Sequence, residues 1–173
     1  MNIEGKISRL RALEPSDVEA LYRWENDLTL WRVSGALAPF SRHTLLRLIE
    51  EQQFDIYATR QQRFIIEDLA GEIIGAIDLL EFDPQNLRAG VGIIIEESAR
   101  RQGYAKDALS TLERYAKDVL HLHQLWCGVT AGNKASEALF RSAGYKQAGL
   151  RKEWTLIESE WYDELIFQKF LQK

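Results

Sequence analysis

The sequence predicts an α/β (or α+β) protein in which helices cover both faces of one mixed sheet. Short segments of alternating apolar and polar residues recur along the chain, and helical segments with apolar residues three and four positions apart separate them. The run Ile93-Ile94-Ile95 is typical of a central strand covered on both faces. The 173 residues suit a single domain over 1–173. We expect a sheet of about seven strands, in the element order β-α-α-β-β-β-α-β-α-β-β.

The N-terminal half predicts a strand, two helices and a hairpin. Alternating residues over Lys6–Leu13 predict the first strand, and Pro15 suits the first turn of the helix that follows. Ser41 is placed to cap a second helix. Arg63–Glu67 and Glu72–Phe82 predict two paired strands, because a polar segment with a glycine separates them and can form a tight turn.

The C-terminal half predicts two strand–helix units followed by two closing strands. Its first helix carries an apolar stripe, which is typical of a helix with one face in the core. The predicted ranges are the strand Leu87–Ile95, the helix Gly103–Leu120, the strand Leu122–Val129, the helix Asn133–Ala143, and the strands Lys146–Trp154 and Trp161–Leu171.

Composition and charge argue against several classes of protein. The 22 Lys and Arg against 26 Asp and Glu give a net charge of −4, so we expect no nucleic-acid partner. No apolar run approaches the roughly 20 residues that cross a membrane, and no signal peptide is recognisable, so we expect a cytoplasmic protein. Cys127 is the only cysteine and the three histidines form no ligand pattern, so we expect neither a disulfide nor a metal site.

The segment after the predicted strand Leu87–Ile95 has features of a phosphate-binding turn. It leads directly into a helix, whose first backbone N–H groups lack internal partners and attract anions. Gly103 lets an anion approach the backbone, Ala105 keeps the first helical turn narrow, and Arg100 and Arg101 add positive charge. Neither a Walker sequence nor a dinucleotide fingerprint is present. An ordinary turn with solvated arginines would have the same residues, so both interpretations stay open.

A second motif has residues at the start and at the end of the predicted helix Asn133–Ala143. Asn133 can cap the start of this helix, and Gly144 can end it in a left-handed conformation. The residues between them include several small side chains, which allow the helix to pack closely against a neighbour. Capping alone would explain Asn133, so this motif also carries little information by itself.

Taken together, the two motifs resemble those of the GNAT superfamily of N-acetyltransferases, and the resemblance covers most of the chain. The first motif of that family is matched by Arg100, Gly103 and Ala105. Four further stretches are similar to the branch that holds spermidine, diamine and ribosomal-protein N-acetyltransferases: Trp24–Asp27, Trp31–Ser34, Gly149–Arg151 and Trp161–Asp163. The second family motif is matched by Asn133, Ser136, Phe140, Gly144 and Tyr145.

The resemblance implies the GNAT fold, with acetyl-coenzyme A (acetyl-CoA) as cosubstrate and no metal. Coenzyme A would lie in a cleft where Val91–Ile95 splays away from Leu125–Val129, with its pantetheine arm along the strand and its pyrophosphate on the helix start. Substrate contacts would come from Trp31 and Ser34. The implied coenzyme A contacts are Ile93, Ile94, Ile95, Arg100, Arg101, Gln102, Gly103, Tyr104, Ala105, Asn133, Ser136 and Phe140.

Two departures from the family pattern concern the catalytic acid and base. Phe140 replaces a tyrosine that would protonate the leaving thiolate, and Gly90 replaces a glutamate that would serve the amine. An alkylammonium must lose a proton before it attacks the thioester, so another group has to accept that proton. Asp78, Glu81 and Tyr162 are the replacements we consider, although residues three apart on a regular strand face opposite sides. Plain surface charge is the alternative interpretation of the two carboxylates.

The sequence therefore predicts transfer of an acetyl group to a primary amine by direct attack, with a small polyamine or diamine as the expected acceptor. A protein N-terminus of the ribosomal-protein type and an antibiotic amine stay open as acceptors. The two departures also leave open a catalytically impaired module that binds acyl-CoA and serves regulation, and an unrelated nucleotide-binding domain is the third alternative. Trp161 and Tyr162 would suit the contact of a homodimer, so the oligomeric state is open.

Overall fold

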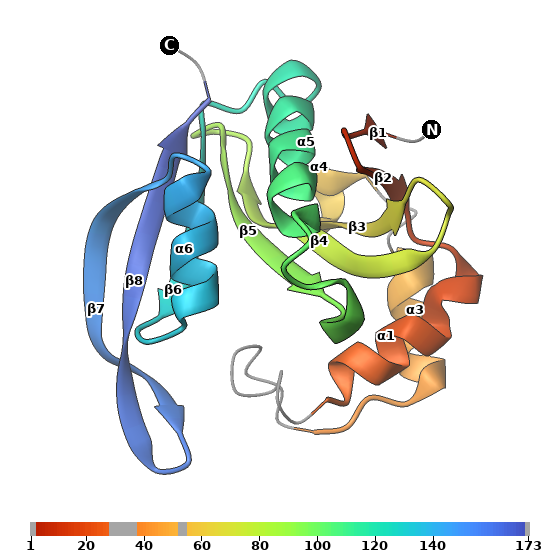
Figure 1. Ribbon diagram of the computed structural model, residues 1–173, viewed down its shortest axis with the longest axis horizontal. Coiled ribbons are helices and arrows are strands. Elements are labelled where there is room, and N and C mark those ends of the chain that lie inside the picture. Colours follow the sequence, from red (N-terminus) through yellow and green to blue (C-terminus); the bar gives the residue numbers. More distant parts are fainter. Residues whose placement is uncertain (1–2, 28–37, 52–54, 172–173) are drawn as a thin grey trace.

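The computed structural model describes residues 3–27, 38–51 and 55–171, and their strands form one sheet of eight strands in the order β1-β2-β3-β4-β5-β6-β8-β7. Neighbouring strands are antiparallel except for β5 and β6, which are parallel, so the sheet is mixed as predicted (Figure 1). The strands are β1 (Ile3–Glu4), β2 (Ser8–Ala12), β3 (Gln62–Asp68), β4 (Ile73–Asp83), β5 (Arg88–Ile95), β6 (Gln124–Thr130), β7 (Lys146–Ile157) and β8 (Glu160–Phe170).

The described helices include the four that the sequence predicts and one short addition. Pro15 begins a 3₁₀ turn, Pro15–Asp17, that leads into the first of them, and the hydroxyl of Ser41 accepts a hydrogen bond from the Thr44 N–H at the start of the second. The sequence analysis missed the short helix α4 and the two-residue strand β1, which carry too few residues for a periodic signal. The helices are α1 (Val18–Glu25), α3 (Arg42–Glu51), α4 (Ile56–Thr59), α5 (Tyr104–Asp118) and α6 (Lys134–Ser142).

Helices cover both faces of the sheet, and the alternation of side chains along the strands explains how. Ile65 on β3 and Ala76 on β4 belong to the apolar cluster formed with α1 and α3. Their neighbours Ile66 and Ile77 point to the opposite face and join the larger cluster that contains the buried residues of α5 and α6. Central strands are therefore buried on both sides, as the isoleucine-rich segment predicted.

The parallel strands β5 and β6 pair over only three positions and then diverge (Figure 1). The register runs from Arg88 beside Gln124 to Gly90 beside Trp126, whereas Ile93 and Ile95 pair with β4 alone among the described strands. The splay between these two strands is thus confirmed. It leaves one edge of the end of β5 without a neighbouring strand in the described parts of the chain.

Asp107 of α5 holds the N-terminal strands onto the helix. Its carboxylate accepts hydrogen bonds from the backbone N–H groups of Lys6, Ile7 and Ser8 at 3.0 Å, and from the Ser8 hydroxyl at 2.8 Å. Burial acts to raise the pKa of this carboxyl, but these hydrogen bonds outweigh it and hold the pKa below its ordinary value. The β1–β2 turn is therefore tied to α5 by an ionised side chain.

The last two strands form a long hairpin at one side of the sheet (Figure 1). The sequence predicted that the strands end at Trp154 and begin again at Trp161, but they continue to a turn made by Glu158 and Ser159 alone. Both turn residues have positive φ, 49° and 71°, as a tight hairpin turn of this kind requires. Trp154 and Trp161 are exposed on this hairpin.

Candidate active site

The start of α5 is a backbone site suited to a phosphate group. Gly103 precedes the helix with φ = +90°, and no side chain caps the helix start. The first backbone hydrogen bond of the helix runs from the Asp107 N–H to the Gly103 carbonyl, at 3.1 Å. The N–H groups of residues 104–106 precede this bond and therefore have no carbonyl partner within the helix. An uncapped helix start with a positive end of its dipole fits the diphosphate of coenzyme A.

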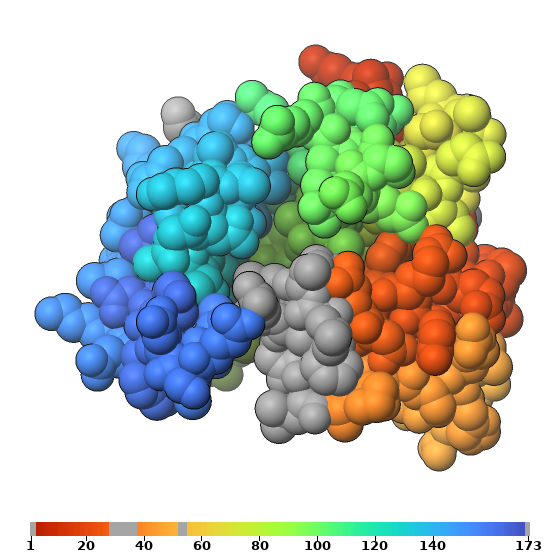
Figure 2. Space-filling view, turned by 60° about the horizontal axis from the view of Figure 1, so that its bottom comes forward, coloured from red at the N-terminus to blue at the C-terminus, as the bar shows by residue number. Residues whose placement is uncertain are grey.

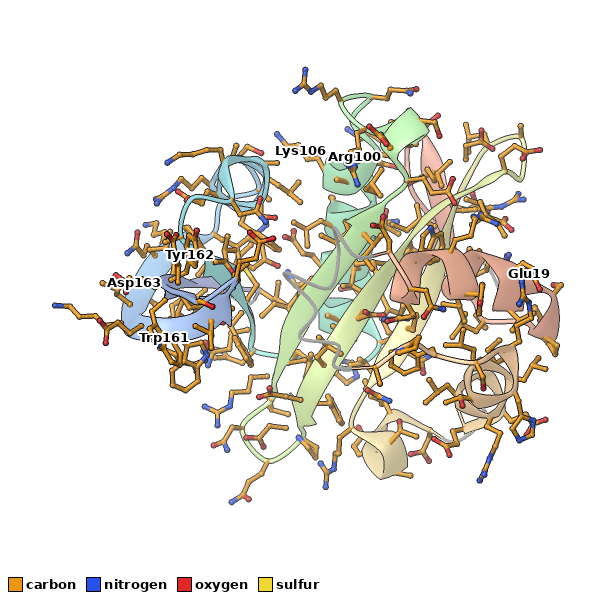
Figure 3. All side chains as sticks on the ribbon, turned by 90° about the horizontal axis from the view of Figure 1, so that it is seen from below. Glu19, Arg100, Lys106, Trp161, Tyr162 and Asp163 are labelled. Carbon is orange, nitrogen blue, oxygen red and sulfur yellow. The ribbon has the colours of Figure 1, made fainter. Side chains whose placement is uncertain are left out.

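Three cationic side chains surround this helix start. Arg100 donates from Nε to the Ile95 carbonyl at 3.1 Å, which fixes it at the end of β5. Arg101 has a positive φ of 61°, and Lys106, which the sequence analysis did not single out, is exposed in the first turn of α5. Figure 3 shows Arg100 and Lys106 together near the start of the helix. The Gln102 side chain instead donates to the Ser98 carbonyl at 2.8 Å.

The isoleucines at the end of β5 divide between the two faces of the sheet. Ile94 packs against the cluster of α1 and α3, whereas Ile93 and Ile95 pack against the cluster of α5. What they offer a ligand is therefore the unpaired backbone edge beside the splay, which an extended chain can pair with. Figure 2 shows the surface hollowed between the cyan atoms of α6 and the green atoms around the start of α5.

The second motif serves the structure of α6. The Asn133 side chain accepts a hydrogen bond from the Ser136 N–H at 3.2 Å, so it caps the helix. Phe140 is buried, and its ring meets the Tyr145 ring edge-on with 5.1 Å between centroids. Gly144 ends the helix with φ = +89°. The capping interpretation of Asn133 therefore holds, whatever else this side chain contacts when a ligand is bound.

Asp78 lies in a buried ion pair at the β5 side of the splay. Arg63 donates to both its carboxylate oxygens, at 2.7 and 3.0 Å, and reaches Glu25 at the end of α1 at 2.6 Å. Burial acts to lower the pKa of Arg63, yet the two carboxylates raise it overall, so the guanidinium stays charged. A Cβ placed on Gly92 of β5 would lie 3.5 Å from the nearer Asp78 oxygen, so this carboxylate sits over a bare stretch of backbone.

The other predicted acceptor residues are scattered. Glu81 is exposed and has φ = +47° at an irregularity of β4, so it does not share a surface with the buried Asp78. Tyr162 on β8 donates its hydroxyl to Glu160 at 3.1 Å, and Figure 3 shows it on the hairpin beside Trp161 and Asp163. Trp31 and Ser34 lie outside the described residues.

The Trp126 ring lies close to position 90. A Cβ built on Gly90 would lie 3.2 and 3.3 Å from two atoms of the indole, which is tighter than most packing contacts. Trp126 is the register partner of Gly90 at the last paired position of β5 and β6. A side chain at position 90 would therefore require the indole to shift.

Glu164 on β8 is the carboxylate that the sequence analysis missed. Its side chain lies over Gly128 of β6, where a Cβ would come within 2.5 Å of one carboxylate oxygen. Its other oxygen accepts a hydrogen bond from Arg151 Nη1 at 2.8 Å. Alternation along β8 could have placed it on the face of Tyr162, but its position over β6 follows from a register that only the fold supplies.

The described residues contain no group of three or more His, Cys, Asp or Glu side chains arranged to hold a metal ion. Within the same residues, no helix is both long and apolar enough to cross a membrane.

Comparisons with known proteins agree with this geometry. A solved structure of spermidine N-acetyltransferase from Vibrio cholerae in complex with CoA and spermine superposes with a TM-score of 0.86 at 22% identity, covering 95% of each chain. In sequence, spermidine N(1)-acetyltransferase of V. cholerae is 24% identical over 89% of this chain and 87% of that protein. The uS5-alanine N-acetyltransferase of Escherichia coli is 26% identical, but over 44% of this chain and 39% of that protein.

The family model of the GNAT acetyltransferase domain matches residues 8–146, which include the splayed strands, the start of α5 and the whole of α6. The paired motifs that suggested this family lie within the matched residues. The chain belongs to the GNAT acetyltransferase family and is an acetyl-CoA-dependent N-acetyltransferase.

Proposed function

We propose that this enzyme acetylates a primary amine of a small polyamine or diamine, by direct attack of the neutral amine on the thioester of acetyl-CoA. The observation that carries the proposal is the pair of carboxylates, Glu25 and Asp78, that meet at the guanidinium of Arg63 beside the splay. Carboxylates at a binding site favour a cationic acceptor over a neutral or anionic one.

The similar proteins support the same substrate class. Spermidine acetyltransferases of V. cholerae and E. coli match most of this chain, at 24% and 26% identity. In our proposal Asp78 attracts the ammonium group, although Arg63 holds both its oxygens and leaves it a poor proton acceptor. Tyr162 contacts the acceptor from β8, and the exposed Glu81 contributes charge to its approach. Trp31 and Ser34 keep the acceptor contacts that the family resemblance implies.

Coenzyme A binding in this proposal uses the unpaired edge at Ile93–Ile95 and the helix start at Arg100–Ala105. Asn133, Ser136 and Phe140 complete the site from α6. No tyrosine stands at position 140, so the leaving thiolate receives no phenolic proton there. A thiolate is a fair leaving group, and correct positioning of the two reactants supplies much of the acceleration.

Thiol release from acetyl-CoA tests the proposal directly. Purified enzyme is assayed against spermidine, spermine, a short diamine, an aminoglycoside and a peptide with N-terminal alanine. We expect kcat/KM for the best polyamine or diamine to exceed that of the peptide and the aminoglycoside by about tenfold or more. A preference for the peptide would favour the ribosomal-protein type of acceptor. Binding of acetyl-CoA without turnover of any amine would favour the impaired module.

Two further features belong to the proposal. A cytoplasmic location suits an enzyme with a single, buried cysteine. The exposed Trp154 and Trp161 on the β7–β8 hairpin are suited to a homodimer contact, which the molecular mass in solution would reveal.

A further inference from the structure

We propose that Glu164 accepts the proton that the acceptor amine loses before its attack, in place of the glutamate that Gly90 cannot supply. The inference rests on the proposed direct attack by a neutral amine, but it does not depend on which primary amine is the substrate. Three properties of Glu164 carry it: its place on the face of the sheet opposite α5 and α6, its position beside the splay, and its incomplete pairing.

Glu164 lies on the face of the sheet that is turned away from α5 and α6. On β8, Leu165 and Phe167 belong to the cluster of α5 and α6, so the side chain of Glu164 points to the opposite face. Trp126 of β6 is on that same opposite face, since its indole contacts Gly90 while Leu125 and Cys127 are in the cluster. This is also the face of β4 and β5 on which α1 and α3 pack.

Glu164 also stands where β5 and β6 have separated. The last paired positions are Gly90 and Trp126, and Gly128 lies two residues further along β6 on the same face. Atoms of the Glu164 carboxylate would lie 2.5, 2.7 and 3.2 Å from a Cβ on Gly128, so the group rests directly on the backbone of β6. Asp78 of β4 lies beside Gly92, two residues beyond Gly90 on β5, with one oxygen 3.5 Å from the position of a Cβ there. The two carboxylates thus lie on either side of the opening, Asp78 beside β5 and Glu164 over β6.

The pairing of Glu164 leaves it able to take up a proton. Arg151 donates to one oxygen, and among the described residues no donor reaches the other oxygen, Oε1. The Arg151 side chain is 43% exposed, and such a pair is weak and readily displaced. Asp78 differs, because the more buried Arg63 bonds both its oxygens. Of the two carboxylates beside the splay, Glu164 is therefore the one with a free oxygen.

The proposed proton transfer and attack conserve atoms and charge. The ammonium group of the acceptor transfers one proton to Glu164 Oε1 and becomes a neutral amine. The nitrogen lone pair forms a bond to the thioester carbonyl carbon, the carbon–sulfur bond breaks, and its electron pair leaves with the sulfur. A second nitrogen proton passes to the thiolate, and Glu164 returns its proton to water. The products are the amide, the free thiol of coenzyme A and one proton.

The test compares Glu164→Gln with the matched control Glu153→Gln, an exposed position on the same hairpin. Each is assayed with the best amine substrate of the wild type, whatever that amine is. We expect Glu164→Gln to lower kcat/KM at neutral pH by about 10² or more, while the control stays within about twofold. Binding of acetyl-CoA, measured by the rise in melting temperature, should be unchanged in both variants.

The pH profile separates a proton acceptor from a merely structural residue. The activity of Glu164→Gln should recover as the pH rises, because a growing share of the amine is then already neutral. Its deficit should also shrink for a weakly basic amine with a pKa of about 7, and Glu164→Asp should restore part of the activity.

Two results would overturn the inference: a Glu164→Gln enzyme with the wild-type rate and pH profile, or a deficit of the same size at every pH and for every amine. Failure of the proposed function is a different result, seen as a wild-type enzyme that prefers an acceptor other than a polyamine or diamine.

Discussion

Each of the two strands that flank the splay has a glycine next to a carboxylate from its neighbouring strand, but the two carboxylates are paired differently. On the β5 side the Asp78 side chain is 11% exposed and lies beside a glycine, and an arginine whose side chain is 26% exposed donates to both its oxygens. On the β6 side the Glu164 side chain is 18% exposed and lies over a glycine, and a half-exposed arginine donates to one of its oxygens. The partner, more than the carboxylate, decides whether such a group stabilises the fold or stays available for chemistry.

The same contrast extends to the two arms of the sheet. Strands β2 to β5 are covered by helices on both faces, and their charged groups are tied into buried networks such as Arg11 with Asp17 and Glu67. The β7–β8 hairpin exposes Trp154 and Trp161 and carries its ion pair at the surface. Substitutions of the buried charged groups in β2 to β5 should therefore change stability, and substitutions of Arg151 or Glu164 in the hairpin should change function with little effect on stability.

The largest expected effect comes from Arg63→Met. Removing the guanidinium leaves Glu25 and Asp78 buried without their shared partner, which should lower the free energy of unfolding by about 3–5 kcal/mol. Urea denaturation measures this change. A loss below about 1 kcal/mol would show that the two carboxylates are well solvated, and the contrast between the arms would not hold.

Asp107→Asn should have the next largest effect, at about 3 kcal/mol, because an amide cannot accept all the hydrogen bonds that this carboxylate receives. The folded state holds the pKa of Asp107 below its ordinary value of 3.8, so its contribution is present above that pH and is lost as the pH falls through the folded pKa. The stability difference between wild type and variant should therefore narrow below about pH 4. Asp118→Asn, at an exposed position on the same helix, is the control.

Gly90→Ala tests the close approach of the Trp126 ring to position 90. The added methyl group meets the Trp126 ring, so stability should fall by about 1–3 kcal/mol. In the Trp126→Ala variant the space of the indole is empty, so adding Gly90→Ala should lower the free energy of unfolding much less. A double-mutant cycle in denaturant measures this coupling. Strictly additive losses would mean that the indole does not restrict position 90.

The smallest effect is expected for Arg151→Ala, which should change the free energy of unfolding by less than about 1 kcal/mol. Activity is the sharper readout, because removing Arg151 frees both oxygens of Glu164 to contact the acceptor amine, so the pH–rate profile should change. A large loss of stability would mean that the Arg151–Glu164 pair stabilises the fold as much as the Arg63–Asp78 pair does, and the two carboxylates would then not differ in role.

Local patterns predicted most of the fold. The helices α1, α3, α5 and α6 and all strands except β1 have apolar periodicities or capping residues that act over a few positions. The turn at Glu158–Ser159 was missed, since neither residue is the asparagine or glycine that usually marks positive φ at both positions.

The site was less predictable because its contacts join strands far apart in the sequence. The glycine at position 90 was correctly identified as a departure, yet its closeness to the Trp126 ring depends on the parallel register of β5 and β6. Glu164 over Gly128 depends likewise on the β6–β8 register. No local pattern specifies such a register, whereas the helix start at Gly103 could be identified because its glycine and its helix are adjacent in the chain.

The outer strand β7 also has a consequence for solubility. It is 12 residues long and forms the last position of the sheet, so its free edge could recruit a strand from another molecule and begin aggregation. Two irregularities, at Gln147–Gly149 and Arg151–Thr155, break that edge into short stretches. Lys152 and Glu153 place charges in the second of them. The hairpin can therefore expose its aromatic side chains without offering a continuous template for cross-β growth.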